Sequence, residues 1–216
     1  MKRAQMIGAG VLVVAAGMAG VAALGGFGHH TNVPAANAIV AASVASADAK
    51  AYEVDAVHSA VVYRIKHHNV AWNYGRFNKF SGQFNLNVEN PSESVLNIKV
   101  DAASIDSANT KRDDHLRGGD FFNAKEHPEL TFTGKTFTKK SDTMWEVTGD
   151  LTLLGQTKSI TVNVEDTGRG AGRGGSEVAG IEAKFDIKRT DFGMNYMAGK
   201  GLSDEVFMIV SFEGGR

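Results

Sequence analysis

The sequence predicts an all-β fold, either an antiparallel sandwich or a closed barrel. About eight segments alternate apolar and polar residues with a period of two, which is typical of strands with one buried face. Short turn signals separate these segments, and one stretch, residues 110–118, carries the signals of a helix. A closed barrel removes exposed strand edges and leaves an interior that is either packed or hollow.

The first 47 residues are interpreted as a leader that precedes the domain. Lys2 and Arg3 are followed by an uncharged run over residues 6–28, which is the layout of a secretory signal. We expect cleavage after Ala47, at the end of a small-residue site, and a domain of residues 48–216. The uncharged run is also long enough to act as an uncleaved membrane anchor. Either interpretation predicts a periplasmic or secreted domain.

The first half of the domain is predicted to hold three strands. Residues 52–55 and 59–68 form one broken strand with Val61, Tyr63 and Ile65 on one face. Residues 69–75 are expected to be irregular. Residues 77–89 then place Phe80 and Phe84 on one face, and residues 94–105 do the same with Ile98.

A short helix is predicted at residues 110–118. Thr110 followed by Asp113 matches a capping box, and Gly118-Gly119 predicts a left-handed end. Phe121 and Phe122 follow directly, so we expect the helix to form a lid over one end of the fold.

Five more strands are predicted after His127-Pro128, at residues 130–139, 144–154, 157–166, 178–189 and 205–213. Residues 140–143 and Gly155-Gln156 are short enough for hairpin turns. The glycine-rich residues 168–175 are predicted to form a flexible loop.

Composition excludes several classes of function. The chain has no cysteine, which excludes a thiol nucleophile and a cysteine-ligated metal. Its net charge of -1 gives no basic excess, so no nucleic acid partner is expected. The 7 histidines lack the spacing of a zinc site, and neither a metal nor another required cofactor is predicted. The 12 phenylalanines form either an ordinary core or the lining of an apolar ligand site.

A catalytic alternative rests on three histidines. His58, His67 and His115 have the side chain that a hydrolase or an isomerase uses for acid–base work. None lies in a recognisable catalytic frame such as G-x-S-x-G, so no catalytic residue is assigned. A further alternative is a ligand-free, stress-related structural module with a packed interior.

Short motifs run in order through the whole domain. They are Tyr52-Glu53-Val54-Asp55, His58-Ser59, His67, Gly75-Arg76-Phe77, Arg112-Asp113-Asp114-His115-Leu116, Asp120-Phe121-Phe122, residues 149–155 and Arg189-Thr190-Asp191-Phe192-Gly193-Met194. Each is weak alone, but the ordered set resembles the YceI-like family of exported lipid-binding proteins. The glycine-rich loop and Gly118-Gly119 depart from the family pattern.

This resemblance implies a lipocalin-like antiparallel barrel of eight strands and no reaction. The barrel would hold a long isoprenoid lipid, of polyprenyl or quinone type, with its polar head near the mouth. We therefore expect an exported, non-catalytic protein that sequesters or carries this lipid. It would contact a membrane transiently or through an uncleaved leader. The sequence leaves open whether the protein forms an oligomer.

The predicted ligand-binding residues combine the apolar strand faces with the helix motif and the motif at residues 189–194. Arg112 and His115 are expected near the polar head, because a partly desolvated head needs donors. Their alternative role is to hold the helix to the barrel wall. The full set is Val61, Tyr63, Ile65, Phe77, Phe80, Phe84, Ile98, Arg112, His115, Leu116, Phe121, Phe122, Phe132, Leu151, Leu153, Phe185, Ile187, Phe192 and Met194.

Overall fold

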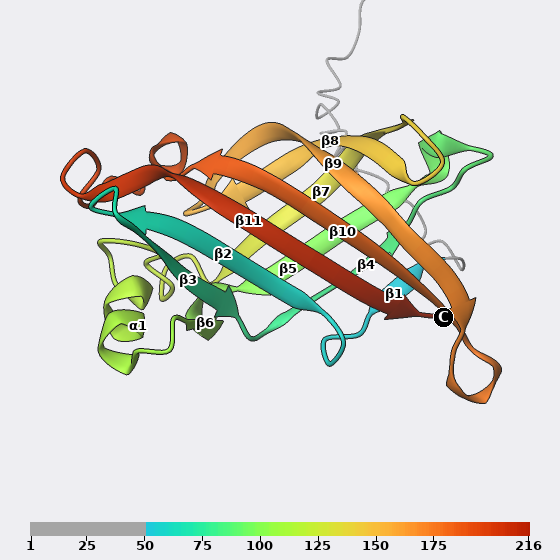
Figure 1. Cartoon of the computed structure of the whole chain (residues 1–216), viewed down its shortest axis with the longest axis horizontal. Coiled ribbons are helices and arrows are strands. Elements are labelled where there is room, and N and C mark those ends of the chain that lie inside the picture. Colours follow the sequence, from blue (N-terminus) through green and yellow to red (C-terminus); the bar gives the residue numbers. More distant parts are fainter. Residues whose placement is uncertain (1–50) are drawn as a thin grey trace, which may run out of the picture. The chain divides into compact units, whose positions relative to one another are not determined.

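The computed structural model describes residues 51–216, and their strands close into a barrel (Figure 1). The predicted leader of residues 1–47 lies outside the described residues. The strands are β1 (Tyr52–Val54), β2 (Ala60–His67), β3 (Ala71–Phe77), β4 (Phe80–Asn85), β5 (Val95–Asp101), β6 (Ile105–Asp106), β7 (Glu129–Lys139), β8 (Met144–Leu153), β9 (Gln156–Ala171), β10 (Glu177–Lys188) and β11 (Leu202–Gly215).

One α-helix and four short 3-10 turns complete the described elements. They are α1 (Thr110–Arg117), η1 (Pro91–Glu93), η2 (Ala102–Ser104), η3 (Arg173–Gly175) and η4 (Arg189–Phe192). Within residues 51–216, no helix has the length and apolar character needed to cross a membrane.

The eleven strand segments make up eight strands of the barrel, because β1 with β2, β3 with β4 and β5 with β6 each occupy one place in the ring. β4 and β3 pair with β1 and β2, and β5 and β6 pair with β4 and β3. β11 closes the ring by pairing with both β1, at Glu53↔Gly215, and β2, at Val61↔Val210. The described strand pairs are antiparallel, so the structure confirms a closed eight-stranded antiparallel barrel with one short helix.

The break between β1 and β2 has a local cause. The Asp55 side chain accepts a hydrogen bond from the Val57 N–H at 2.8 Å, which turns the chain away from the ladder. Ser59 then replaces the missing ladder contacts, since its Oγ accepts from the Glu213 N–H at 3.0 Å and lies 3.3 Å from the Glu213 carbonyl oxygen. The predicted broken strand is confirmed.

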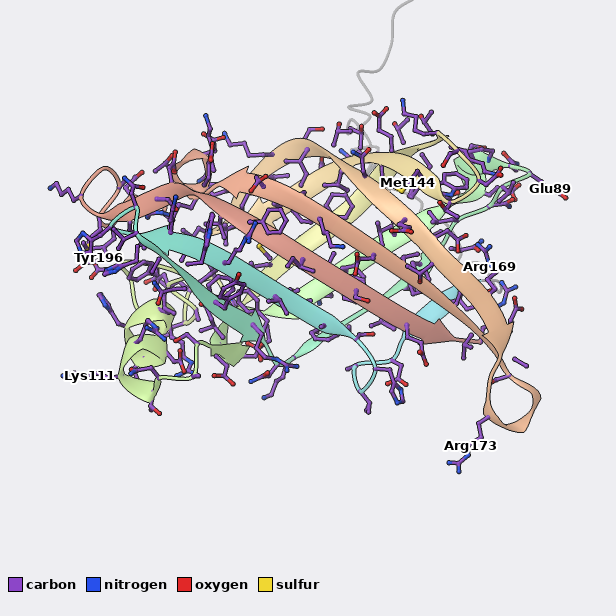
Figure 2. The ribbon with its side chains drawn as sticks, viewed as in Figure 1. Glu89, Lys111, Met144, Arg169, Arg173 and Tyr196 are labelled. Carbon is purple, nitrogen blue, oxygen red and sulfur yellow. The ribbon has the colours of Figure 1, made fainter. Side chains whose placement is uncertain are left out.

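The barrel is packed at one end. Trp145, Val147, Tyr52 and Phe84 are all buried there, and the Tyr52 and Phe84 rings stack with centroids 5.7 Å apart. Helix α1 and the β2–β3 and β10–β11 connections lie at the opposite end (Figure 1). Figure 2 shows Tyr196 and Lys111 at this second end and Arg173, at the β9–β10 turn, at the first.

Three turn predictions were wrong. Residues 69–75 are mostly strand β3, and the preceding turn uses His68 and Asn69 with φ of 49° and 56°. The β8–β9 hairpin turns at Leu154 and Gly155, one residue earlier than predicted. The first half of the glycine-rich stretch is strand, because residues 168–171 of β9 pair with residues 177–180 of β10, and Arg173–Gly175 form η3.

The helix lies where it was predicted, but its ends differ from the prediction. Asn109, not Thr110, is the N-cap, and its side chain accepts a hydrogen bond from the Arg112 N–H at 3.0 Å. Gly118 ends the helix with φ of -75°, so the end is extended rather than left-handed.

Candidate ligand cavity

A cavity of about 380 Å³ lies inside the barrel at the end that carries α1. Its walls come from β2, β3, β7, β8, β10 and β11, from α1 and the segment after it, and from the connection between β10 and β11. Tyr74 and Tyr196 line it while remaining 53% and 39% exposed, so the cavity opens to solvent beside them. We call this opening the mouth and this cavity the upper cavity.

A lower cavity of about 100 Å³ continues toward the packed end. The side chains that line both cavities form a collar between them. The collar consists of Phe77, Leu130, Leu151, Phe185 and Met208. Below it the lining is almost wholly apolar, and therefore suits hydrocarbon.

The structure places most of the predicted ligand-binding residues around these two cavities. Those on the upper cavity are Tyr63, Ile65, Phe77, Arg112, His115, Leu116, Phe121, Phe122, Leu151, Leu153, Phe185, Ile187 and Met194. Those on the lower cavity alone are Val61, Ile98 and Phe132. Their role in binding a ligand stays a prediction.

Three predicted residues line neither cavity. Phe84 packs on Tyr52 and Phe80 packs on Phe212, with ring centroids 5.7 and 5.8 Å apart. Phe192 belongs to a separate buried cluster with Phe121, Leu153 and Met194.

Several lining residues were missed from the sequence. The missed residues of the upper cavity are Asn73, Tyr74, Ser107, Leu130, Tyr196, Leu202, Val206 and Met208, whereas Arg189 and Met197 lie where the sequence placed wall or lining residues. Asn73 and Tyr74 fall in the stretch predicted to be irregular, and the residues of the β10–β11 connection follow no strand period. Strand alternation could have found Val206 and Met208, which share one face of β11.

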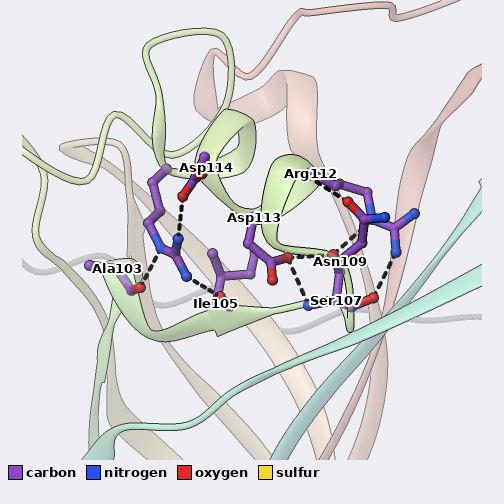
Figure 3. Close-up of polar contacts among 8 residues, drawn as sticks. Ala103, Ile105, Ser107, Asn109, Arg112, Asp113 and Asp114 are labelled. Atoms are coloured by element: carbon purple, nitrogen blue, oxygen red, sulfur yellow. Dashed lines mark hydrogen bonds and ion pairs between the residues drawn. The ribbon is translucent and has the colours of Figure 1, made fainter.

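Helix α1 is fastened to β6 by polar contacts (Figure 3). Arg112 donates from Nε to Ser107 Oγ at 2.7 Å and from Nη2 to the Ser107 carbonyl at 2.6 Å. The Asp113 carboxylate accepts from both the N–H and the hydroxyl of Ser107. Arg117 donates to the carbonyls of Ala103 and Ile105 at 2.8 and 3.0 Å. The helix is thus held against the wall beside the mouth.

Arg112 and His115 both border the upper cavity, but each makes a contact that holds local structure. Besides the Arg112 contacts to Ser107, His115 Nε2 lies 2.8 Å from Asp120 Oδ2. The His115 ring packs at the edge of Phe121 and Tyr196. These contacts match the wall-holding role that the sequence left as the alternative.

Arg189 organises the other side of the mouth. It is only 1% exposed and donates to the carbonyls of Met194, Tyr196 and Ser203 at 2.8 to 2.9 Å, with a longer contact to Leu202 at 3.4 Å. Burial lowers the pKa of the Arg189 guanidinium, and the Asp204 carboxylate partly opposes this. The side chain therefore fixes the β10–β11 connection, which places Met194 and Tyr196 on the cavity.

The three histidines of the catalytic alternative make separate contacts. His58 Nδ1 lies 2.8 Å from Asp55 Oδ2 and 3.8 Å from Glu213 Oε1, and this interaction raises the pKa of His58 and lowers that of Asp55. His67 and His115 line the upper cavity, and the His67 ring packs on His68. In the part of the chain that the structure describes, no hydrogen bond joins any two of these three.

The donor atoms of Asp55, His58 and Glu213 lie within 4.8 Å of one another, so they could approach one cation. The side chains of His58 and Glu213 are 62% and 46% exposed, and His58 already pairs with Asp55. The group carries no functional assignment, because exposed carboxylates beside a histidine are ordinary surface features.

Fold and cavities together define a small β-barrel that encloses an apolar hollow open at one end. Comparison with known proteins places the chain in a family. The model of the YceI-like domain matches residues 52–214, and the chain belongs to this family.

Curated relatives match over most of their length. Protein YceI of Escherichia coli is 38% identical over 174 residues, which are 80% of this chain and 90% of the relative. A UPF0312 protein of Photorhabdus laumondii is 40% identical over 177 residues, which are 81% of this chain and 91% of the relative.

Solved structures share the barrel. BcnA of Burkholderia cenocepacia superposes with a TM-score of 0.68 at 26% identity, covering 74% of this chain and 99% of its own. A polyisoprenoid binding domain from Saccharophagus degradans, implicated in plant cell wall breakdown, superposes with a TM-score of 0.57 at 16% identity. The shared region covers 76% of this chain and 98% of that domain, and this likeness is one of fold.

Proposed function

We propose that this protein binds an isoprenoid lipid of polyprenyl or quinone type in its barrel. In this proposal it sequesters or carries the lipid outside the cytoplasm, as a periplasmic or secreted protein, and catalyses no reaction. The observation that carries the proposal is the pair of adjoining apolar cavities with a mouth at one end. The polyisoprenoid binding domain that shares the fold supports the choice of lipid class.

The cavity volumes set a scale for the buried tail. A protein cavity of about 150 Å³ takes one benzene molecule, which has six carbons. On that scale, the upper cavity of about 380 Å³ holds ~15 carbons and the lower cavity of about 100 Å³ holds ~4 more. The cavities therefore suit three to four isoprene units, and a longer tail must displace side chains or extend through the mouth.

Burial of the tail can supply the affinity. Each methylene removed from water contributes about 0.8 kcal/mol, so ~15 carbons contribute ~12 kcal/mol before costs. Association costs roughly 4–15 kcal/mol of lost motion, so burial of the tail leaves at most ~8 kcal/mol of net binding free energy. Contacts to the head group then decide which lipid is preferred.

Exposed aromatic side chains beside the mouth support a transient contact with a membrane. Trp72, Tyr74 and Tyr196 are 44%, 53% and 39% exposed, and Tyr74 and Tyr196 border the cavity. Tryptophan and tyrosine favour the boundary between water and hydrocarbon, since each has an apolar ring and a polar group. A lipid could pass between bilayer and barrel at such a boundary.

Mass spectrometry of a solvent extract tests the proposal. The exported protein is purified from its native host and extracted, and an isoprenoid lipid is expected in stoichiometric amount. Leu151→Trp, which enlarges a collar side chain, is expected to reduce the lipid content, whereas Val57→Trp is the control because Val57 is 83% exposed. Extracts that repeatedly lack lipid would contradict the proposal. The intact mass also shows whether residues 1–47 were removed.

A further inference from the structure

Tyr63 presents a hydroxyl group inside the upper cavity. The side chain lines the cavity from β2 and is only 9% exposed. Within residues 51–216, no group forms a hydrogen bond with this hydroxyl. Among residues 51–216, the fully enclosed side-chain polar atoms without a partner are Arg64 Nε and Trp145 Nε1, so the Tyr63 hydroxyl is accessible to a ligand or water in the cavity.

The fold reserves space for this hydroxyl. Gly75 lies opposite Tyr63 in the β2–β3 ladder, and a Cβ atom at Gly75 would lie 2.3 Å from the Tyr63 hydroxyl oxygen. The φ angle of Gly75 is outside the left-handed region, so space and not backbone conformation requires glycine there. The Tyr63 ring packs against Phe77 at 6.0 Å, which fixes the direction of the hydroxyl.

Tyr63 remains a neutral donor at ordinary pH. Burial raises the pKa of Tyr63 to about 12, the nearby Asp113 carboxylate adds to the rise, and Arg112 opposes it.

Asn73 is the next inward-facing residue of β3 after Gly75 in the direction of the mouth. It lies opposite Ile65 in the ladder and also lines the cavity. Its side-chain amide forms no hydrogen bond within the described residues. The β2–β3 wall thus offers two neutral polar groups in a row.

The two guanidinium groups on the cavity both make contacts within the protein. Arg189 donates to backbone carbonyls on three or more residues, and Arg112 donates twice to Ser107. Arg112 uses two of its five N–H donors on Ser107, and a phosphate dianion on the cavity would depend mainly on the donors that remain. A neutral oxygen needs only a hydrogen bond.

We propose that Tyr63 donates a hydrogen bond to a carbonyl or hydroxyl oxygen of the ligand head, with Asn73 as a second polar contact. The preferred ligands are then prenyl alcohols or quinones rather than prenyl phosphates. This proposal rests on the proposed function and adds to it the class of head group. It places the head on the β2–β3 wall and the tail against the apolar side chains of β8 and β10.

Three probes with the same tail of ~15 carbons test this proposal, a length that matches the upper cavity. They are farnesol, farnesyl phosphate and the hydrocarbon farnesene, and their binding to the lipid-free protein is measured by displacement of a fluorescent apolar dye. We expect farnesol to bind more tightly than farnesyl phosphate. Tyr63→Phe keeps the ring, and should weaken farnesol about three- to tenfold while leaving farnesene unchanged.

Matched variants separate the outcomes. Tyr74→Phe removes a hydroxyl at the exposed rim and should change none of the three affinities. Equal effects of Tyr63→Phe on farnesol and farnesene would overturn the proposal. Tightest binding of farnesyl phosphate, lost in Arg112→Gln, would also overturn it and leave the proposed function intact. If farnesene and the other probes all fail to bind, the proposed function itself falls, and this inference with it.

Discussion

Filling the lower cavity should stabilise the lipid-free protein. Ala183 faces this cavity from β10 and is 7% exposed, and Ala183→Leu adds ~3 carbon atoms at that place. Three carbons at about 0.8 kcal/mol each give ~2.4 kcal/mol. Filling about 100 Å³ at roughly 24 cal/mol per Å³ gives the same figure. Imperfect fit reduces both values, so we expect a gain of ~1–2 kcal/mol in the free energy of unfolding.

Urea unfolding of the delipidated variant, followed by the fluorescence of the buried Trp145, measures this gain. For a domain of this size the melting temperature should rise by about 2 to 8 °C. Ala179→Leu is the matched control, because Ala179 lies on the same strand, is 4% exposed and borders neither cavity. Its added carbons overpack the barrel and should cost roughly 1–3 kcal/mol. Equal destabilisation by both substitutions would refute a hollow at Ala183.

Ala183→Leu should also shorten the isoprenoid tail that the protein binds best. In the wild-type protein, a tail that reaches the lower cavity gains up to ~3 kcal/mol from ~4 extra carbons. Ala183→Leu occupies that space, so the advantage of a 20-carbon over a 15-carbon prenyl alcohol should disappear. An advantage that persists in the variant would show that longer tails lie elsewhere.

Three further substitutions test the mouth and the packed end. Arg189→Met should lower the free energy of unfolding by about 3–5 kcal/mol, because it removes the donors to several buried carbonyls, and a loss below ~1 kcal/mol in urea would contradict that role. Asn109→Ala should cost ~1 kcal/mol through loss of the α1 cap, and Asn109→Asp should restore most of it. His58→Gln should change how stability varies with pH. The Asp55 carboxylate raises the pKa of His58, so the pair stabilises the fold below the unfolded pKa of 6.5 and loses this contribution as pH rises through the folded pKa. Asp55 has the opposite sign, since its lowered pKa contributes above 3.8 and is lost as pH falls through the folded value. Wild type and His58→Gln should therefore differ most near pH 5–6 and converge near pH 9, and a difference that grows with pH would disprove the pairing.

Strand alternation predicted the barrel well because most strands bury one apolar face. The broken first strand, the helix at residues 110–117 and the hairpin at residues 140–143 all follow from local signals, and the structure has each of them. The glycine-rich stretch was mispredicted because glycine indicates flexibility only when no partner strand is present. Here β10 pairs along residues 168–171 and holds them extended.

Alternation predicts which face a side chain occupies, but not its depth along the barrel. Phe80 and Phe84 have the same apolar, inward pattern as Phe77. Register places Phe84 opposite Tyr52 at the packed end and places Phe77 opposite Val61 at the collar. Because register depends on pairings between distant segments, the boundary between solid core and cavity could not be found from a single strand.

Strand β3 shows why the mouth itself was missed. Its inward positions near the mouth are Asn73 and Gly75, while its outer face carries Trp72 and Tyr74, the reverse of an ordinary barrel strand. The Trp72 ring on the outer face makes a cation–π contact with the Arg64 guanidinium, whose carbon lies 4.4 Å from the ring centroid. The inner face is polar and small because it surrounds a hollow, where Gly75 leaves room for the Tyr63 hydroxyl. Sequence rules that assume a packed interior fail where the interior is hollow. If the ligand head lies on this wall as proposed, Asn73→Val should restore alternation while weakening farnesol and sparing farnesene, and equal weakening of both would contradict a polar contact from Asn73.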